Sequence, residues 1–135
     1  MTEISSEVLR CAIGKAIISV EMWKRSFTDE LRIQFADGSL IRIMDDGQDC
    51  CEKRYMVCDD DLPSFVNSEL RGVEINDAPE IPDGDGEVHE VQFLVIHTSK
   101  GDITCSNHNE HNGYYGGFNI VVENVIETGS QAAKP

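Results

Sequence analysis

The chain has 135 residues, of which 40% are hydrophobic and 27% charged, and this length suits one domain with its own core. It carries 25 acidic residues against 11 basic ones, a formal net charge of -14. Such a charge repels phosphate backbones and anionic lipid, which argues against direct nucleic-acid binding and against a membrane surface. The first residues lack a signal-peptide pattern and no segment reaches membrane-spanning length, so we expect a cytoplasmic protein with reduced thiols.

The N-terminal half predicts a helix, a strand and a hairpin, over residues 7–12, 16–23 and 31–43. Ser5-Ser6 offers a serine to cap the helix, and Gly14 is suited to end it. Apolar and polar residues alternate from Leu31 to Phe35, and Asp37-Gly38 then provides a turn. This alternation around a tight turn is typical of a β-hairpin.

The C-terminal part predicts strands over residues 55–58, 72–75, 91–96, 103–105 and 118–122. Residues 91–96 are nearly all apolar, which indicates a central strand covered on both faces. Asp59–Asp61, followed by Pro63, favour the start of a second short helix that would include Leu70. Residues 76–90 are acidic and rich in proline and glycine, so we expect an exposed loop there.

These elements predict a single α+β domain over residues 1–127, followed by a flexible tail over 128–135. Its strands would form one twisted antiparallel sheet of six or seven strands with one or two short helices. The free edges of such a sheet could pair in a homodimer, although no sequence feature selects one.

Two short motifs are unusual for an ordinary small domain. The first is Gln48-Asp49-Cys50-Cys51-Glu52, where a strand leaves a turn. Neighbouring side chains of an extended chain point to opposite faces, so one cysteine would pack inside and the other face a site. The second is Asn112-Gly113-Tyr114-Tyr115, in which a turn presents two aromatic rings to a planar ligand or a protein partner.

We expect a ligand site where these two turns meet. Its predicted contacts are Gln48, Asp49, Cys51, Glu52, Asn112, Tyr114 and Tyr115. The spacing Cys105-x-x-His108-x-x-His111 also allows a zinc site, although the segment lacks a recognised four-ligand pattern.

A thiol- or metal-dependent enzyme is one alternative, with Cys50 or Cys51 as nucleophile and a histidine, His97, His108 or His111, as base. The carboxylates of Asp49 and Glu52 argue against it because they would raise the thiol pKa and leave little thiolate. The chain also has no phosphate loop, dinucleotide fingerprint or nucleophile elbow. We therefore favour a protein that binds without catalysis.

With both motifs in view, the chain resembles an uncharacterised family of small proteins from bacteriophages and bacteria. The resemblance covers about residues 13–122 and is most specific in the cysteine motif. It includes Gly14–Ile17, Phe35–Gly38, Gln48–Glu52, Leu70–Ile75, Thr98–Gly101 and Asn112–Tyr115. The family usually has an aromatic strand where this chain has Cys105–His111, which counts against a metal site. The resemblance implies a phage or prophage setting and the host cytoplasm, but no activity.

Our leading hypothesis is a non-catalytic phage-type binding protein that antagonises a host factor. It would capture either a small ligand or a basic protein surface. A further alternative is an acidic mimic of nucleic acid, formed by the acidic second half of the chain, in which the acids between Asp77 and Glu90 would be essential.

Overall fold

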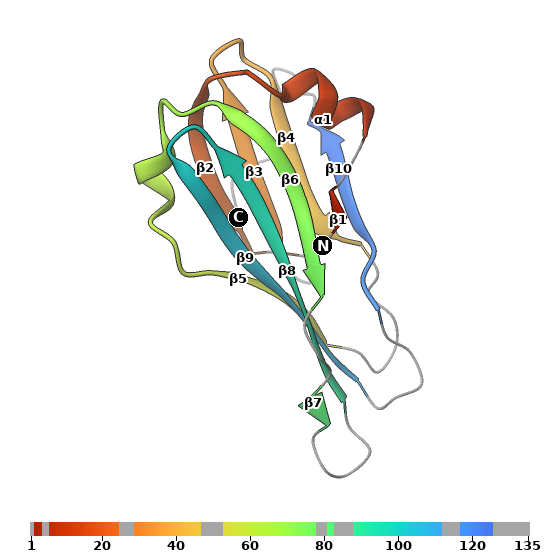
Figure 1. The fold of residues 1–135 in the computed structure, drawn as a ribbon. Coiled ribbons are helices and arrows are strands. Elements are labelled where there is room, and N and C mark those ends of the chain that lie inside the picture. Colours follow the sequence, from red (N-terminus) through yellow and green to blue (C-terminus); the bar gives the residue numbers. More distant parts are fainter. Residues whose placement is uncertain are drawn as a thin grey trace.

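The computed structural model describes residues 2–3, 6–24, 29–46, 53–77, 81–82, 88–111 and 117–125. Within these ranges the chain is mostly β, with ten strands in two antiparallel sheets, one α-helix and one 3-10 helix (Figure 1). The larger sheet has the order β1–β6–β8–β9–β5, with β7 paired to β8. Its strands are Thr2–Glu3 (β1), Lys53–Cys58 (β5), Leu70–Asp77 (β6), Ile81–Pro82 (β7), Val88–Thr98 (β8) and Gly101–His111 (β9).

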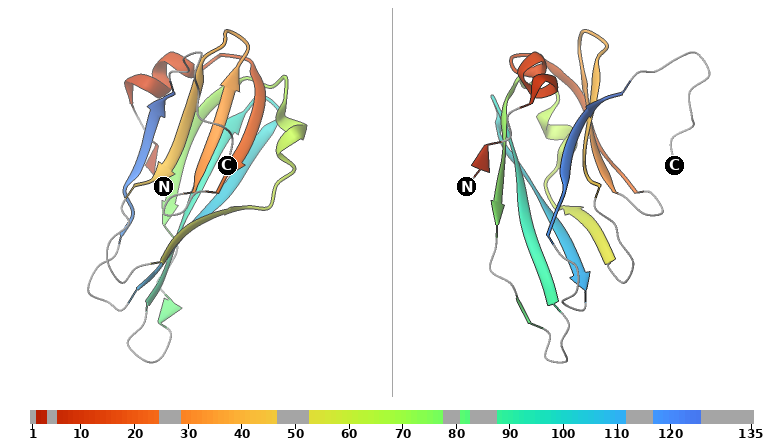
Figure 2. Two further views of the ribbon diagram at one scale, coloured as in Figure 1. Left: turned by 180° about the vertical axis from the view of Figure 1, so that it is seen from behind. Right: turned by 90° about the vertical axis from the view of Figure 1, so that its right-hand side faces the viewer.

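The smaller sheet has the order β10–β4–β3–β2. Its strands are Ile17–Trp23 (β2), Glu30–Phe35 (β3), Leu40–Asp45 (β4) and Ile120–Asn124 (β10). The two sheets lie face to face, as the right-hand view of Figure 2 shows, and β8 and β9 extend past the smaller sheet at one end (Figures 1 and 2). The fold is therefore a two-layer sandwich.

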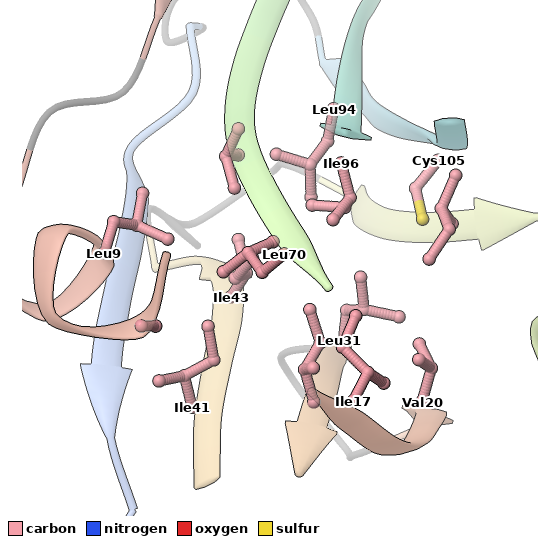
Figure 3. Packing of buried hydrophobic residues seen from close by; sticks show 14 of the residues in the cluster. Leu9, Ile17, Val20, Leu31, Ile41, Ile43, Leu70, Leu94, Ile96 and Cys105 are labelled. Atoms are coloured by element: carbon pink, nitrogen blue, oxygen red, sulfur yellow. The ribbon is translucent and has the colours of Figure 1, made fainter. Parts of the chain in front are cut away.

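One hydrophobic core fills the space between the sheets. Alternate residues of each strand point inward, as with Leu31, Ile33 and Phe35 of β3, each 0% exposed. The facing sheet contributes Leu94 and Ile96 from β8, and Figure 3 shows side chains from both layers in contact. Burial of these side chains away from water is the main force that holds the two layers together.

The predicted N-terminal helix and hairpin are confirmed. Helix α1 spans Glu7–Ala12, and the Ser6 Oγ accepts a hydrogen bond from the Leu9 amide at 3.1 Å. Its Leu9 side chain is buried in the core. Strands β3 and β4 form the expected hairpin around Asp37-Gly38, with Gly38 at φ 90°, a conformation that favours glycine.

The prediction of a single sheet is wrong. Strand β4 pairs with β3 and with β10, whereas β5, the next strand along the chain, joins the other sheet beside β9. The described residues contain ten strands, more than the six or seven predicted, and eight remain when the two-residue strands β1 and β7 are left out. Strand β8 is central, but its outward-facing Phe93 is 37% exposed, so only one of its faces is covered by the core.

The second predicted helix is limited to one 3-10 turn, Leu62–Phe65 (η1). Val66 is extended and Asn67 has a positive φ of 73°, so the helical path ends before Leu70, which begins β6 instead. The Asp60 carboxylate does not cap this turn but accepts a hydrogen bond from the Thr104 amide at 2.7 Å. Asp60 thus bonds to the sheet, while Asp61 precedes η1 as its N-cap residue without a side-chain hydrogen bond.

Two segments predicted as irregular contain strand. Within the predicted acidic loop 76–90, residues 76–77 complete β6, residues 81–82 form β7, and residues 88–90 begin β8. Strand β9 does not end at Cys105 but continues to His111, paired with β8 and β5. The tail predicted over 128–135 lies outside the described residues. No helix in the described ranges is long and apolar enough to cross a membrane.

Candidate functional site

The strand ends that flank the two sequence motifs lie at the same end of the sandwich. The first occupies residues 48–52, between β4 and β5, and the second occupies residues 112–115, between β9 and β10. The Asp46 amide, just before the first motif, donates to the Asn119 carbonyl at 2.8 Å. The Asp45 Oδ1 accepts from the Asn119 amide at 2.9 Å. The chain before the first motif is thus joined to the chain after the second.

The predicted ligand contacts themselves lie outside the described residues. They are Gln48, Asp49, Cys51, Glu52, Asn112, Tyr114 and Tyr115, and Cys50 lies outside with them. The site can therefore be described from the strands that flank the two motifs.

Next to the motifs, the inner face of the larger sheet changes from apolar to polar. Along β9, Ile103 and Cys105 face the core, and the next inward side chains belong to Asn107, Asn109 and His111. These three residues are buried, with exposures of 1%, 0% and 7%. We call the polar inner face of this sheet the polar stripe. It consists of Arg54, Glu90, Gln92, Asn107, Asn109 and His111.

Strand register places the members of the polar stripe side by side. Asn109 lies between Arg54 of β5 and Glu90 of β8, and Asn107 lies beside Gln92 of β8. Directly paired residues of antiparallel strands share a face, with Cβ atoms about 5 Å apart. The polar stripe is therefore continuous across three strands.

Glu90 connects the polar stripe to Gly117, which follows the second motif. Its Oε1 accepts from His111 Nε2 at 2.6 Å and from the Gly117 amide at 2.9 Å. Asn109 Nδ2 donates to the Gly117 carbonyl at 3.2 Å. Gly117 has a φ of 75°, which disfavours a residue with a side chain. The chain leaving the second motif is thus fixed at its backbone by two side chains of the polar stripe.

An ion pair between the two sheets lies beside the first motif. Arg54 Nη1 is 2.9 Å from both carboxylate oxygens of Asp45, and these side chains are only 6% and 8% exposed. Asp45 ends β4 and Arg54 lies near the start of β5, so the pair connects the two ends of the first motif. Low exposure makes the interaction strong but also makes each charge costly to leave alone.

Asn107 stands out within the polar stripe. Its side chain is buried, yet neither its Oδ1 nor its Nδ2 has a hydrogen-bond partner among the residues that the structure describes. The Oε1 of the neighbouring Gln92 is also buried and without a partner there, while its Nε2 donates to Asp77 at 2.7 Å. An unmet buried polar group costs about 1–3 kcal/mol. The stability of the fold therefore does not explain why the side-chain amides of Asn107 and Gln92 are buried here.

The structure does not bring the predicted metal ligands together. Cys105 and His111 point to the inner face of β9, whereas His108, an odd number of residues from each, points to the outer face. A span of six residues in a strand is about 20 Å, which separates Cys105 from His111 as well. In the described part of the chain, no group of three or more His, Cys, Asp or Glu side chains could hold a metal ion.

On the outer face, His108 belongs to a cluster of polar and aromatic side chains. Its ring stacks on Tyr55 with centroids 4.6 Å apart. Its Nδ1 is 2.9 Å from His89 Nε2, and its Nε2 is 2.9 Å from Ser106 Oγ. The Tyr55 hydroxyl donates to Glu110 Oε2 at 2.5 Å. Burial first, and then the bonded carboxylate of Glu110, raise the pKa of Tyr55 to about 12.

We expect His108 to make the protein less stable in mild acid. Burial, and then the charge of His89, lower the pKa of His108 below its usual 6.5. The unfolded chain therefore binds the proton first, so stability present above about pH 6.5 is lost as the pH falls through the folded-state pKa. Between about pH 7 and about pH 5, wild type should lose more unfolding free energy in urea titrations than His108→Gln.

The difference between the two proteins isolates His108. The pKa of His97 is raised, mainly by its bond to Asp102, so this residue contributes the opposite trend, but it is present in both proteins. Parallel stability curves for wild type and His108→Gln would contradict the assignment.

The residues of the polar stripe, apart from His111, were not predicted as site residues. In sequence, Asn107 and Asn109 resemble loop residues, and Glu90 resembles part of an exposed acidic segment. One feature of the sequence could have identified the β9 members. Residues 103, 105, 107, 109 and 111 occupy every second position, so in a strand they share one face, and this inward face continues beyond the apolar part.

Glu90 is turned inward and bonded to His111, which removes one acidic side chain from the exposed face that a nucleic-acid mimic would need.

Comparison with known proteins identifies a family. A family model described as a domain of unknown function, DUF7448, matches residues 10–121. No curated protein and no solved structure matches the chain significantly. The matched range contains both motifs and the whole polar stripe. The expected membership of an uncharacterised family is confirmed, and the family's description names no substrate, partner or reaction.

Proposed function

Because the chain belongs to the DUF7448 family of domains of unknown function, we propose from its geometry that it is a non-catalytic binding protein for a small polar ligand. The ligand would contact the polar stripe at the end of the sandwich from which both motifs leave. In this proposal the strands provide a fixed base of amide groups, and the motif residues Asp49, Tyr114 and Tyr115 provide further contacts.

The observation that carries the proposal is the unmet hydrogen-bonding capacity of Asn107. A buried asparagine offers one acceptor and two donor positions. Here both its Oδ1 and its Nδ2 find no partner among the described residues, whereas Asn109 donates through its Nδ2 and Glu90 accepts through its Oε1. Unmet polar groups of this kind reduce stability and are retained where function uses them.

The chemistry of the amides indicates the class of ligand. Asn107 offers an acceptor and donors, and Gln92 adds a second acceptor through its Oε1. A ligand with neighbouring donors and acceptors, such as an amide or a heterocyclic base, could satisfy both side chains. Two tyrosines in the second motif would add flat faces for a planar ring.

The biological setting that we propose is the capture of a host molecule by a phage or prophage protein. The resemblance noted in the sequence supports this setting, and the net charge of -14 supports a soluble partner rather than nucleic acid. A basic protein surface is the macromolecular alternative, and it predicts binding that weakens steeply with salt.

Native mass spectrometry tests the proposal directly. Protein purified under reducing, chelator-free conditions should carry the mass of a small organic molecule, which denaturation releases. Protein freed of that molecule should regain it from an extract of host metabolites, with a rise in melting temperature. Asn107→Leu should bind none. If wild type shows only its bare mass and no extract or polar metabolite library raises its melting temperature, the proposed function is wrong.

A further inference from the structure

Two cysteines lie opposite each other in the larger sheet. Cys58 is the last residue of β5, and Cys105 is its direct partner in β9. Both side chains point to the inner face, where Cys105 is fully buried and Cys58 packs partly against the core. Both are free thiols. The sequence motifs do not include this pair.

The position of the pair suits a disulfide bond. Directly opposed residues of antiparallel strands have Cα atoms about 4.5 or 5.5 Å apart, depending on the type of pair. Disulfides join residues whose Cα atoms are about 4.4–6.8 Å apart. Both types of pair fall in this range, so the two sulfurs could join with little movement of β5 or β9.

The surroundings give the two thiols different roles. A hydrogen bond from Cys105 is the main factor that lowers the pKa of Cys58 to about 7, against burial and the charges of Asp60 and Asp59. The same contact, together with burial, raises the pKa of Cys105 far above its usual value. Cys58 is therefore the better nucleophile near neutral pH, and Cys105 keeps its proton.

We propose that Cys58 and Cys105 are a redox-modification site that forms a reversible cross-strand disulfide with a hydroperoxide as oxidant. The Cys58 thiolate attacks one peroxide oxygen, the O–O bond breaks, and a sulfenic acid and hydroxide form. The Cys105 sulfur then attacks the Cys58 sulfur, the S–O bond breaks, and the leaving hydroxide takes the Cys105 proton as water. Two thiols are oxidised, and with hydrogen peroxide one molecule is reduced to two waters.

The Cys58–Cys105 disulfide would add a covalent link between the edge strand β5 and its neighbour β9. Strand β5 is at the edge of its sheet and is paired only with β9 in the described part of the chain. It begins directly after the first motif, and the next inward pair below the cysteines is Met56 and Asn107. The disulfide would thus fix β5 at the border between the apolar core and the polar stripe.

Peptide mapping of the wild-type protein tests this inference independently of any ligand. The reduced protein is treated with hydrogen peroxide, alkylated and digested with trypsin. Cleavage after Arg54, Arg71 and Lys100 yields peptides 55–71 and 101–135, each with a single cysteine. We expect these two peptides joined by a disulfide, with the mass of two hydrogens lost and recovered on reduction.

Variants and pH add the controls. Cys11→Ser, which removes an exposed thiol of α1, should leave the cross-link unchanged, whereas Cys58→Ser should abolish it. The initial rate should rise several-fold between about pH 6 and about pH 8, as Cys58 becomes thiolate. Oxidation of Cys58 to sulfinic acid without the cross-link, or absence of the joined peptides while Cys11 is oxidised, would overturn the proposal.

Discussion

Replacing Arg54 with alanine should reduce the free energy of unfolding by about 3–5 kcal/mol. The substitution leaves the Asp45 carboxylate buried, at 8% exposure, without the guanidinium that lies 2.9 Å from both of its oxygens. A buried charge that loses its partner is among the most destabilising changes in a protein interior. Urea denaturation followed by circular dichroism measures the effect.

The matched control for this variant is Arg71→Ala. Arg71 pairs with Glu69 at 3.1 Å, but these side chains are 58% and 50% exposed, so water and salt screen the pair. We expect a loss of less than about 1 kcal/mol. The double variant Asp45→Leu/Arg54→Met, which removes both charges, should recover much of the stability. Equal losses for Arg54→Ala and Arg71→Ala would show that burial of the Asp45 pair does not matter.

Replacing Asn107 with leucine should make the protein more stable and unable to bind. Leucine is close to asparagine in size and adds no unmet polar atom, so the free energy of unfolding should rise by about 1–3 kcal/mol. The same variant removes the donor and acceptor that we assign to the ligand. Denaturant unfolding and ligand titration on the same samples should therefore show a higher free energy of unfolding together with a loss of ligand affinity.

Asn109→Leu is the control on the same face, two residues further along β9. Asn109 Nδ2 donates to the Gly117 carbonyl, so Asn109→Leu removes a hydrogen bond that Asn107→Leu leaves intact, and it should lower the free energy of unfolding by about 1 kcal/mol relative to Asn107→Leu. If Asn107→Leu lowers stability to a similar extent, Asn107 has a structural partner such as an ordered water, and the ligand assignment is wrong.

Local patterns were enough to predict the elements that depend on neighbours in sequence. Ser6 and Gly14 bracket α1, and the alternation from Leu31 to Phe35 identifies a β-strand without knowledge of its layer. The division into two sheets depends on partners far apart in the chain. Strand β5 pairs with β9 about fifty residues later, and nothing in Lys53–Cys58 specifies that partner. Such nonlocal pairing is set by the packing of the whole core.

The predicted motif residues lie outside the described residues, and the sequence analysis did not predict the polar stripe beside them, apart from His111. Residues 106–111 are Ser, Asn, His and Glu, which rarely favour strands, so the second half of β9 was not expected. It forms because β8 and β5 supply backbone partners on both sides. Asp45 and Arg54 flank the first motif with opposite charges. This pattern predicts an ion pair between the two sheets only when β4 and β5 are known to lie in different sheets.

The length of β8 and β9 has a consequence for how members of this family could diversify. Each strand contributes to the apolar core with one half and to the polar stripe with the other, with the border near Cys105. If the polar stripe is the binding surface that we propose, substitutions beyond that border would change the bound ligand while leaving the apolar half of each strand in place. In that case binding and packing would depend on separate stretches of the same two strands.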